Sequence, residues 1–178
     1  MSVRLRLSAP ILNIMFEKVE DHLKYKEFFD DIKLHWKVFR DEAKNVIDKE
    51  ITIPWHEEKL HNNKWDVFPI IWQRQLSPLS EYTNNSFDIV NKYSFVRNCG
   101  FSIMRPQCEI YPHAGYTNEV LRCHLGLIVP EGNCGIKVED EVCNWREGDI
   151  LFFDDTKLHS TWNKTDQMRV VLLVDLDK

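Results

Sequence analysis

The chain has 178 residues, of which 43% are apolar, 12% aromatic and 29% charged, with a formal net charge of −5. This composition excludes a disordered chain, and a negative charge without any run of Lys or Arg argues against nucleic acid as a partner. No stretch approaches the roughly 18 apolar residues of a membrane span. We therefore expect one domain over residues 1–178, which is long enough for a single hydrophobic core.

The N-terminal region superficially resembles a signal peptide, because Arg4 and Arg6 precede an apolar stretch. Pro10 and Asn13 interrupt that stretch, and no small-residue cleavage pattern follows it. The five cysteines are odd in number and contain no C-x-x-C pair, so they indicate neither a disulfide framework nor a zinc knuckle. We expect a cytoplasmic protein.

Two helices are predicted in the N-terminal part, over residues 16–29 and 31–49, because apolar residues recur there with helical spacing. Asp30 and Asp31 are available near the start of the second helix, where acidic side chains are favourable. A third helix is predicted over residues 80–93, although two adjacent asparagines weaken it.

Four histidines fall in this first part of the chain. His22 and His35 lie within the predicted helices, and we expect them at the surface or at the edge of the core. His56 and His61 lie in or beside a polar, loop-like segment, and we expect both to be solvated.

The rest of the chain predicts β structure. Residues 65–73 are typical of a strand, in which Pro69 indicates an edge or a bulge. Short β-like runs separated by turn residues follow at 101–104, 108–112, 121–129, 135–138, 150–153, 160–162 and 170–174. Seven strands without an intervening helix predict a sandwich or barrel, most simply a jelly roll. The expected organisation is a helical part at about 14–50 and a β core at about 65–178.

The strand at 121–130 carries polar residues on one face. Alternation places Leu121, Cys123, Leu125, Leu127 and Val129 on one side and Arg122, His124, Gly126 and Ile128 on the other. An arginine and a histidine that point inward together cost desolvation free energy, which an anionic ligand or a metal would offset. The alternative is that both are satisfied interior polar groups.

His113 and His159, 46 positions apart, suit the metal site of a cupin-like jelly roll. In many non-haem iron(II) oxygenases a carboxylate stands two residues after the first histidine and completes a two-His-one-carboxylate triad. That position is Gly115 here, so the obvious triad is absent. Asp154 and Asp155 follow an apolar strand, and we expect them to be turn or hydrogen-bonding groups.

Several motifs carry a resemblance to a known family. They are FSIMRP at 101–106, PHAGYTN at 112–118, LRCHLGL at 121–127, WREGDILFFDD at 145–155, HSTW at 159–162 and Arg169 before VVLLVD. In sequence and spacing they resemble the aspartyl/asparaginyl β-hydroxylase family of 2-oxoglutarate-dependent oxygenases. The resemblance extends more weakly to residues 35–42 and Trp65. The family also lacks the third carboxylate ligand, so Gly115 agrees with it.

The resemblance implies an Fe(II)- and 2-oxoglutarate-dependent dioxygenase, mainly β after N-terminal helices, with a double-stranded β-helix core of the jelly-roll type. It implies that His113 and His159 are the catalytic residues and hold Fe(II). The other implied site residues bind the cosubstrate: Arg169 and Ser102 at its distal carboxylate, Arg122 and His124 at its other end, and Trp65 along the pocket.

The resemblance further implies a reaction that consumes O2 and hydroxylates an unactivated carbon, such as the β-carbon of an Asp or Asn residue or of a related amino-acid-like substrate. The large animal members carry a membrane anchor and helical repeats that this sequence does not contain. Val120 and Gly100 stand where the family's substrate-contacting arginine and lysine are expected. We therefore expect an amino acid, a short peptide or another small metabolite as substrate.

Two other hypotheses for the function follow from the same residues. Because Gly115 replaces the carboxylate, chloride could bind the iron instead, which would make the protein a halogenase. The second alternative is a non-enzymatic cupin that binds a small anion through Arg122 and Arg169. A chloride requirement would favour the first, and Fe(II) binding without decarboxylation of 2-oxoglutarate would favour the second.

Overall fold

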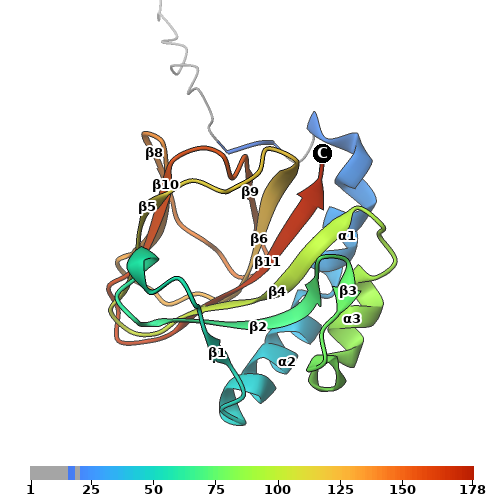
Figure 1. The fold of residues 1–178 in the computed structure, drawn as a ribbon, viewed down its shortest axis with the longest axis horizontal. Coiled ribbons are helices and arrows are strands. Elements are labelled where there is room, and N and C mark those ends of the chain that lie inside the picture. Colours follow the sequence, from blue (N-terminus) through green and yellow to red (C-terminus); the bar gives the residue numbers. More distant parts are fainter. Residues whose placement is uncertain (1–15, 19–20) are drawn as a thin grey trace, which may run out of the picture.

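The computed structural model describes residues 16–18 and 21–178. Two β-sheets face one another, and helices cover the outer face of the larger sheet (Figure 1). This mainly β arrangement with N-terminal helices confirms the fold class predicted from the sequence. The signal-peptide-like stretch around Arg4 and Arg6 lies outside the described residues.

The larger sheet has seven strands in the order β1-β2-β4-β11-β6-β9, with β3 paired to β2. Its strands are β1 (Ile53–Pro54), β2 (Trp65–Trp72), β3 (Gln75–Leu76), β4 (Val96–Met104), β6 (Val120–Ile128), β9 (Ile150–Phe153) and β11 (Arg169–Asp177). The smaller sheet has the order β5-β10-β7-β8. Its strands are β5 (Cys108–His113), β7 (Cys134–Val138), β8 (Glu141–Cys143) and β10 (His159–Asn163).

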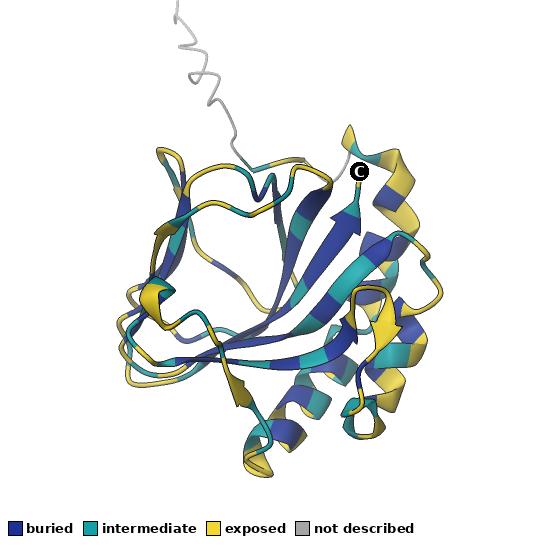
Figure 2. Cartoon of the chain, viewed as in Figure 1, coloured by how far each residue is buried: buried dark blue, intermediate teal, exposed yellow. Residues whose placement is uncertain are grey.

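The helices pack their apolar faces on the larger sheet. They are α1 (Lys26–Leu34), α2 (Trp36–Asp48) and α3 (Asn84–Val90), with 3-10 turns η2 (Leu23–Tyr25), η3 (Glu58–Leu60) and η4 (Ser80–Tyr82). Phe29 of α1 and Phe39 of α2 are fully buried in the main core together with Leu125 of β6. Figure 2 shows this burial along the inner faces of the helices and along the strands of the larger sheet. Within the described residues, no helix is long and apolar enough to cross a membrane.

The boundaries predicted for the first two helices are wrong. Phe16 forms an isolated bridge with Phe153 of β9, and the α-helix begins only at Lys26. Long-range pairing with the sheet therefore determines the conformation of Phe16, in place of the local helical pattern. The helices separate at His35, whose ψ of 14° is not helical, so Asp30 and Asp31 lie inside α1. Positions 19–20 of the first predicted helix are outside the described residues.

One histidine prediction is also wrong. His61 is buried, and its Nε2 lies 3.1 Å from the backbone oxygen of Trp55. It also forms an isolated bridge with Ile110 of β5, so a distant strand covers what the sequence shows as a polar loop. His56 is exposed, and His22 and His35 are partly exposed, as predicted.

The alternation predicted for β6 holds along most of the strand. Leu121, Cys123 and Leu125 belong to the core under the helices, so Arg122 and His124 point to the opposite face, between the two sheets. A register shift between Val170 and Val171 of β11 interrupts the alternation near Leu127. Val129 consequently packs with the cluster between the sheets, and Ile128 packs with the core under the helices, which corrects the prediction for both residues.

Pro69 lies where the pairing of β2 with β4 changes register, because Pro69 faces Gly100 and Ile71 faces Cys99. The bulge predicted from this proline is therefore present. A bulge is the place where an internal strand tolerates a residue that has no N–H group to donate.

Candidate metal and cosubstrate site

The smaller sheet brings His113 and His159 side by side. His113 ends β5 and His159 begins β10, and the two residues are direct partners in the antiparallel pairing of these strands. Their ring centroids lie 4.2 Å apart. His159 is buried, whereas His113 is partly exposed.

Both imidazoles are held in the same way by the backbone. The Nδ1 of His113 lies 2.8 Å from the oxygen of Tyr111, and the Nδ1 of His159 lies 2.8 Å from the oxygen of Lys157. A carbonyl oxygen can only accept, so each Nδ1 carries a hydrogen, and in the neutral form of the ring the lone pair is on Nε2. This hydrogen bond to the second ring nitrogen is how metal-binding histidines are usually oriented.

The charge state of His159 also suits a metal ligand. Burial lowers the pKa of His159 to about 4, and the nearby His113 and Arg122 lower it too, against a raising effect of the hydrogen bond to Lys157. The imidazole is therefore neutral at neutral pH, which is the form that binds a metal. Within residues 16–18 and 21–178, no group of three or more His, Cys, Asp or Glu side chains is arranged to hold a metal ion. The pair fits a metal whose other positions are filled by small molecules.

Asp155 fills the space beside Gly115. A Cβ atom on Gly115 would collide with the Asp155 carboxylate, and the Gly115 N–H donates to the Asp155 backbone oxygen at 2.8 Å. The carboxylate lies 2.7 Å from Nη1 of Arg122 and 3.4 Å from Nε2 of His159. Burial raises the pKa of Asp155, and the Arg122 guanidinium opposes that rise. Its neighbour Asp154 accepts hydrogen bonds from the N–H and hydroxyl of Thr156, which is the expected turn role.

Arg169 is the most deeply buried charged side chain of the site. It is 1% exposed, and no carboxylate of the described residues forms a salt bridge with it. Its Nη1 donates to the Ser102 backbone oxygen at 3.2 Å, its Nε has no partner, and its guanidinium carbon lies 4.4 Å from the Trp145 ring centre. Burial lowers the pKa of Arg169 to about 10, which still leaves it charged at neutral pH. A buried cation without a counter-ion indicates a site for an anion.

His124 offers a second unused donor in the same region. The Trp145 Nε1–H donates to Nδ1 of His124 at 3.4 Å. Burial lowers the pKa of His124 well below its ordinary value, and the charges of Arg169 and Arg122 add to this effect. The ring is therefore neutral and carries its hydrogen on Nε2, a buried atom without a partner.

The other three residues singled out in the sequence lie around this region. Trp65 donates from Nε1 to the Ser102 hydroxyl oxygen at 3.0 Å, and Arg169 Nη1 lies 3.5 Å from the same oxygen. Arg122 forms two ion pairs, from Nε to Asp175 at 2.9 Å and from Nη1 to Asp155. Its charge is thus already balanced, in contrast to that of Arg169.

All seven residues form one connected cluster. Phe153 links the two halves, since its ring lies 5.4 Å from that of His124 and 5.3 Å from that of His159. Trp145 contacts both Arg169 and His124. Nothing in the sequence assigned a role to Trp145 or Phe153. Their only sequence signal was membership of the motif at 145–155, because contacts between residues so far apart depend on the fold.

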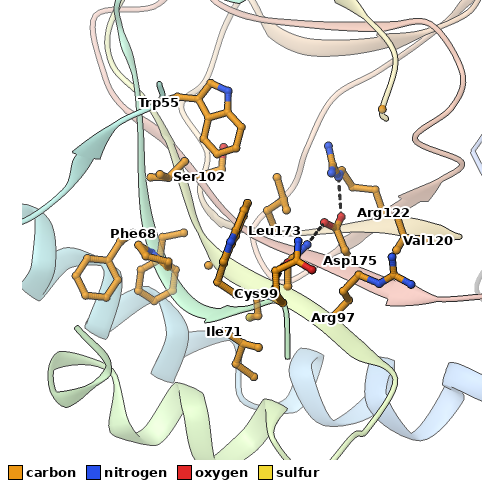
Figure 3. Close-up of a pocket in the computed structure, with 18 of the residues that line it drawn as sticks. Trp55, Phe68, Ile71, Arg97, Cys99, Ser102, Val120, Arg122, Leu173 and Asp175 are labelled. Atoms are coloured by element: carbon orange, nitrogen blue, oxygen red, sulfur yellow. Dashed lines mark hydrogen bonds and ion pairs between the residues drawn. The ribbon is translucent and has the colours of Figure 1, made fainter. Parts of the chain in front are cut away.

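A cavity of about 860 Å³ opens beside this cluster. Trp65, Ser102, His113 and Arg122 line it at the site, and it continues along β2 to Trp72 and Leu76. Figure 3 shows Ser102 on one side and the Arg122–Asp175 pair on the other, with Leu173 between them.

The sequence matches the protein family described as aspartyl/asparaginyl beta-hydroxylase over residues 33–178. The aspartyl/asparaginyl beta-hydroxylase of Mus musculus is 32% identical over 161 residues, which are 85% of this chain and 22% of the mouse protein. The ornithine lipid ester-linked acyl 2-hydroxylase of Rhizobium tropici is 47% identical over 96 residues, which are 53% of this chain and 34% of that protein. The chain thus spans about a fifth of the length of the mouse relative.

The fold resembles that of a prolyl-4-hydroxylase from Pseudomonas putida. The TM-score is 0.53 at 12% sequence identity, and the match covers 80% of this chain and 87% of that chain. At this identity the likeness shows the fold alone, and it agrees with the double-stranded β-helix expected from the sequence.

Proposed function

Since the chain belongs to the aspartyl/asparaginyl β-hydroxylase family, we propose that it is an Fe(II)- and 2-oxoglutarate-dependent dioxygenase that hydroxylates an unactivated carbon. The relatives are named for two kinds of carbon, in an aspartyl or asparaginyl residue and in an ester-linked acyl chain. The proposed reacting carbon is accordingly the β-carbon of an Asp, an Asn or a related amino-acid-like substrate, or a carbon of an acyl chain.

The buried, uncompensated charge of Arg169 is the observation that carries this proposal. A carboxylate placed there would receive the free Nε–H of Arg169, and a guanidinium can bind both oxygens of a carboxylate. The Ser102 oxygen already accepts the Trp65 N–H, which leaves its own hydrogen free to donate. We assign the binding of the distal carboxylate of 2-oxoglutarate to Arg169 and Ser102. Trp65 would line the pocket beside them.

His113 and His159 would hold Fe(II) through their Nε2 atoms, since their Nδ1–H groups are used by the backbone. The neutral His124 would donate its unused Nε2–H to the other end of the cosubstrate. Arg122 also faces that end, but its pairing with Asp155 and Asp175 makes positioning these carboxylates its main task. When bound, Fe(II) and 2-oxoglutarate supply with O2 the oxidative decarboxylation that drives hydroxylation.

The test is an anaerobic titration of Fe(II) and 2-oxoglutarate, observed through the weak visible absorption of the ternary complex. We expect the band in the intact protein and its loss in His159→Ala and Arg169→Ala. His35→Ala serves as control, because His35 lies at the junction of α1 and α2 in the helix layer. No band in a correctly folded protein would sink the oxygenase proposal. If 2-oxoglutarate still bound through Arg169, the small-anion-binding cupin would replace it, and a chloride requirement for turnover would point to the halogenase.

A further inference from the structure

The cavity beside the cluster is large for a small-molecule site. Its volume of about 860 Å³ lies near the upper end of the roughly 300–1,000 Å³ typical of small-molecule sites. Next to the Ser102 level of the larger sheet, the register aligns Pro69, Gly100 and Leu173 across three neighbouring strands. No residue of this row carries a polar side chain. We call the part of the cavity lined by Val67, Pro69, Leu173, Ile53, Trp72 and Leu76 the apolar arm.

Gly100 keeps the arm free of charge. A Cβ atom at this position would lie 2.6 Å from the Phe68 backbone oxygen and 3.2 Å from the Pro69 Cα. The close approach of the β2 backbone therefore requires glycine here. A lysine, as expected from the family pattern, could not be accommodated at this point without moving β2.

The charged residues on the Arg122 side of the cavity are paired with one another, whereas Gln73 and Gln75 lie exposed near Trp72 and Leu76. Asp175 accepts from Asn98 Nδ2 at 2.9 Å and from Arg122 Nε at 2.9 Å. Arg97 pairs with Asp177 and with Glu119, at 2.6 and 2.7 Å. Of the buried side-chain atoms without a hydrogen-bond partner among the described residues, none belongs to the apolar arm. A polar substrate would find partners at the mouth, at Gln73 and Gln75, but not deeper in the arm, where burying it would cost free energy.

The mouth of the arm carries exposed apolar residues beside Gln73 and Gln75. Ile53, Trp72 and Leu76 are 44%, 51% and 50% exposed, and all three line the cavity. Ile53 lies on β1 and Leu76 lies on β3. Both strands pair with β2, so both residues lie beside β2. Exposed apolar residues that continue into a cavity indicate an apolar ligand.

We propose that the apolar arm holds an extended alkyl chain, so that the substrate is a lipid-like molecule whose acyl or alkyl carbon is presented to His113 and His159. The reaction part of this inference rests on the proposed function, and the binding part does not. Each further methylene that enters the arm should tighten binding about three- to fourfold, until the arm is full.

The experiment measures displacement of a dansyl-labelled undecanoic acid from the full chain by saturated fatty acids of increasing length and by an aspartyl peptide. We expect affinity to rise with chain length and then level off, with no displacement by the peptide. Val67→Lys should weaken fatty-acid binding at least about tenfold, because a lysine would need to bury its charge in the arm. Val142→Lys is the matched control, since Val142 is 60% exposed on β8 and outside the cavity.

Trp72→Ser and Leu76→Ser keep the test informative if Val67→Lys does not fold, because both side chains are about half exposed at the mouth. Each should weaken binding by about three- to tenfold.

Three outcomes would overturn the inference: affinity that does not depend on chain length, unchanged affinity in the arm variants, or preferential displacement of the probe by the peptide. The visible Fe(II)–2-oxoglutarate band, recorded on the same samples, separates the two proposals. A band without fatty-acid binding retains the dioxygenase alone, and fatty-acid binding without a band retains the arm alone.

Discussion

Arg169 lies wholly inside the protein without a carboxylate beside it, and its contribution to stability should therefore differ from its contribution to binding. We expect Arg169→Met to raise the free energy of unfolding of the ligand-free protein by about 1 kcal/mol, because an isolated buried charge is replaced by an apolar side chain of similar length. The same variant should lose the stabilisation that 2-oxoglutarate would give if it binds as proposed. Urea denaturation with and without 2-oxoglutarate measures both effects, and the exposed Arg146, changed to Met, is the control. A large loss of stability without ligand would mean that Trp145 and Ser102 alone balance the charge.

Gly115 offers a second prediction at the scale of single residues. Its Cβ position coincides with the Asp155 carboxylate, so Gly115→Ala should lower the free energy of unfolding by about 1–3 kcal/mol through overpacking. In an Asp155→Gly background the collision with the carboxylate is gone and only the backbone oxygen of residue 155, at 3.2 Å, stays close, so the cost should fall clearly. Denaturation of both single variants and the double variant gives the coupling energy. Simple additivity of the two changes would show that the carboxylate moves aside freely.

The roles of residues could be predicted from the sequence only where a motif or an alternation fixed them. The inward direction of Arg122 and His124 followed from the period of β6. The position of Asp155 against Gly115 did not, because it depends on how the segment after β9 returns beside the end of β5. The burial of His61 was likewise invisible, since Ile110 covers it from a strand far along the chain.

At the scale of elements, Asp177 ties the last strand to its neighbours. Burial raises the pKa of Asp177, but hydrogen bonds and charges from Arg74 and Arg97 outweigh this and hold it below its ordinary value. A carboxylate with a lowered pKa stabilises the fold above its unfolded pKa of about 4, and this contribution is lost as the pH falls through the lowered value. We expect Asp177→Asn to lower the melting temperature at pH 7.

The difference between the parent and Asp177→Asn should shrink as the pH falls below about 4, where the parent carboxylate becomes neutral too. Thermal melts from pH 7 to pH 2.5 measure it. Asp140→Asn is the control, because Asp140 is fully exposed and lies 3.9 Å from Lys137. A difference that stayed constant over this range would show that the shape of the side chain at 177, and not its charge, is what matters.

The elements themselves were predictable to different degrees. Alternation located the long strand β6, a short apolar run at 170–174 located the first half of β11, and helical spacing located α2. The start of α1 was not predictable, because Phe16 packs on Phe153 with ring centres 6.1 Å apart and pairs with the sheet instead of entering the helix. Short strands such as β1 and β3 have no period of their own. They form because the backbone of β2 is available for pairing on the side away from β4.

For the whole molecule, the two sheets contribute different halves of the proposed site. His113 and His159 belong to the smaller sheet, whereas Arg169 and Ser102 belong to the larger one. A cosubstrate that reaches from the metal to Arg169 would therefore connect the sheets. The sequence predicted the members of both halves, but not the apolar arm beside them, since that arm arises from the alignment of Pro69, Gly100 and Leu173 across separate strands.

This division predicts that metal and cosubstrate stabilise the protein synergistically. In the proposed site either one alone would contact mainly one sheet, but together they would link β5 and β10 to β11, so the melting-temperature rise with both should exceed the sum of the separate rises. Anaerobic melts with Fe(II), with 2-oxoglutarate and with both measure this, because a ligand that binds only the folded state stabilises it according to its concentration and affinity.

Coupling between two ligands is reciprocal, so Fe(II) should tighten 2-oxoglutarate binding by the same factor by which 2-oxoglutarate tightens Fe(II) binding. In Arg169→Met the Fe(II) effect should persist while the synergy disappears. Purely additive rises in the parent protein would mean that the metal and the anion occupy independent sites, which is the behaviour expected if no molecule connects His159 with Arg169.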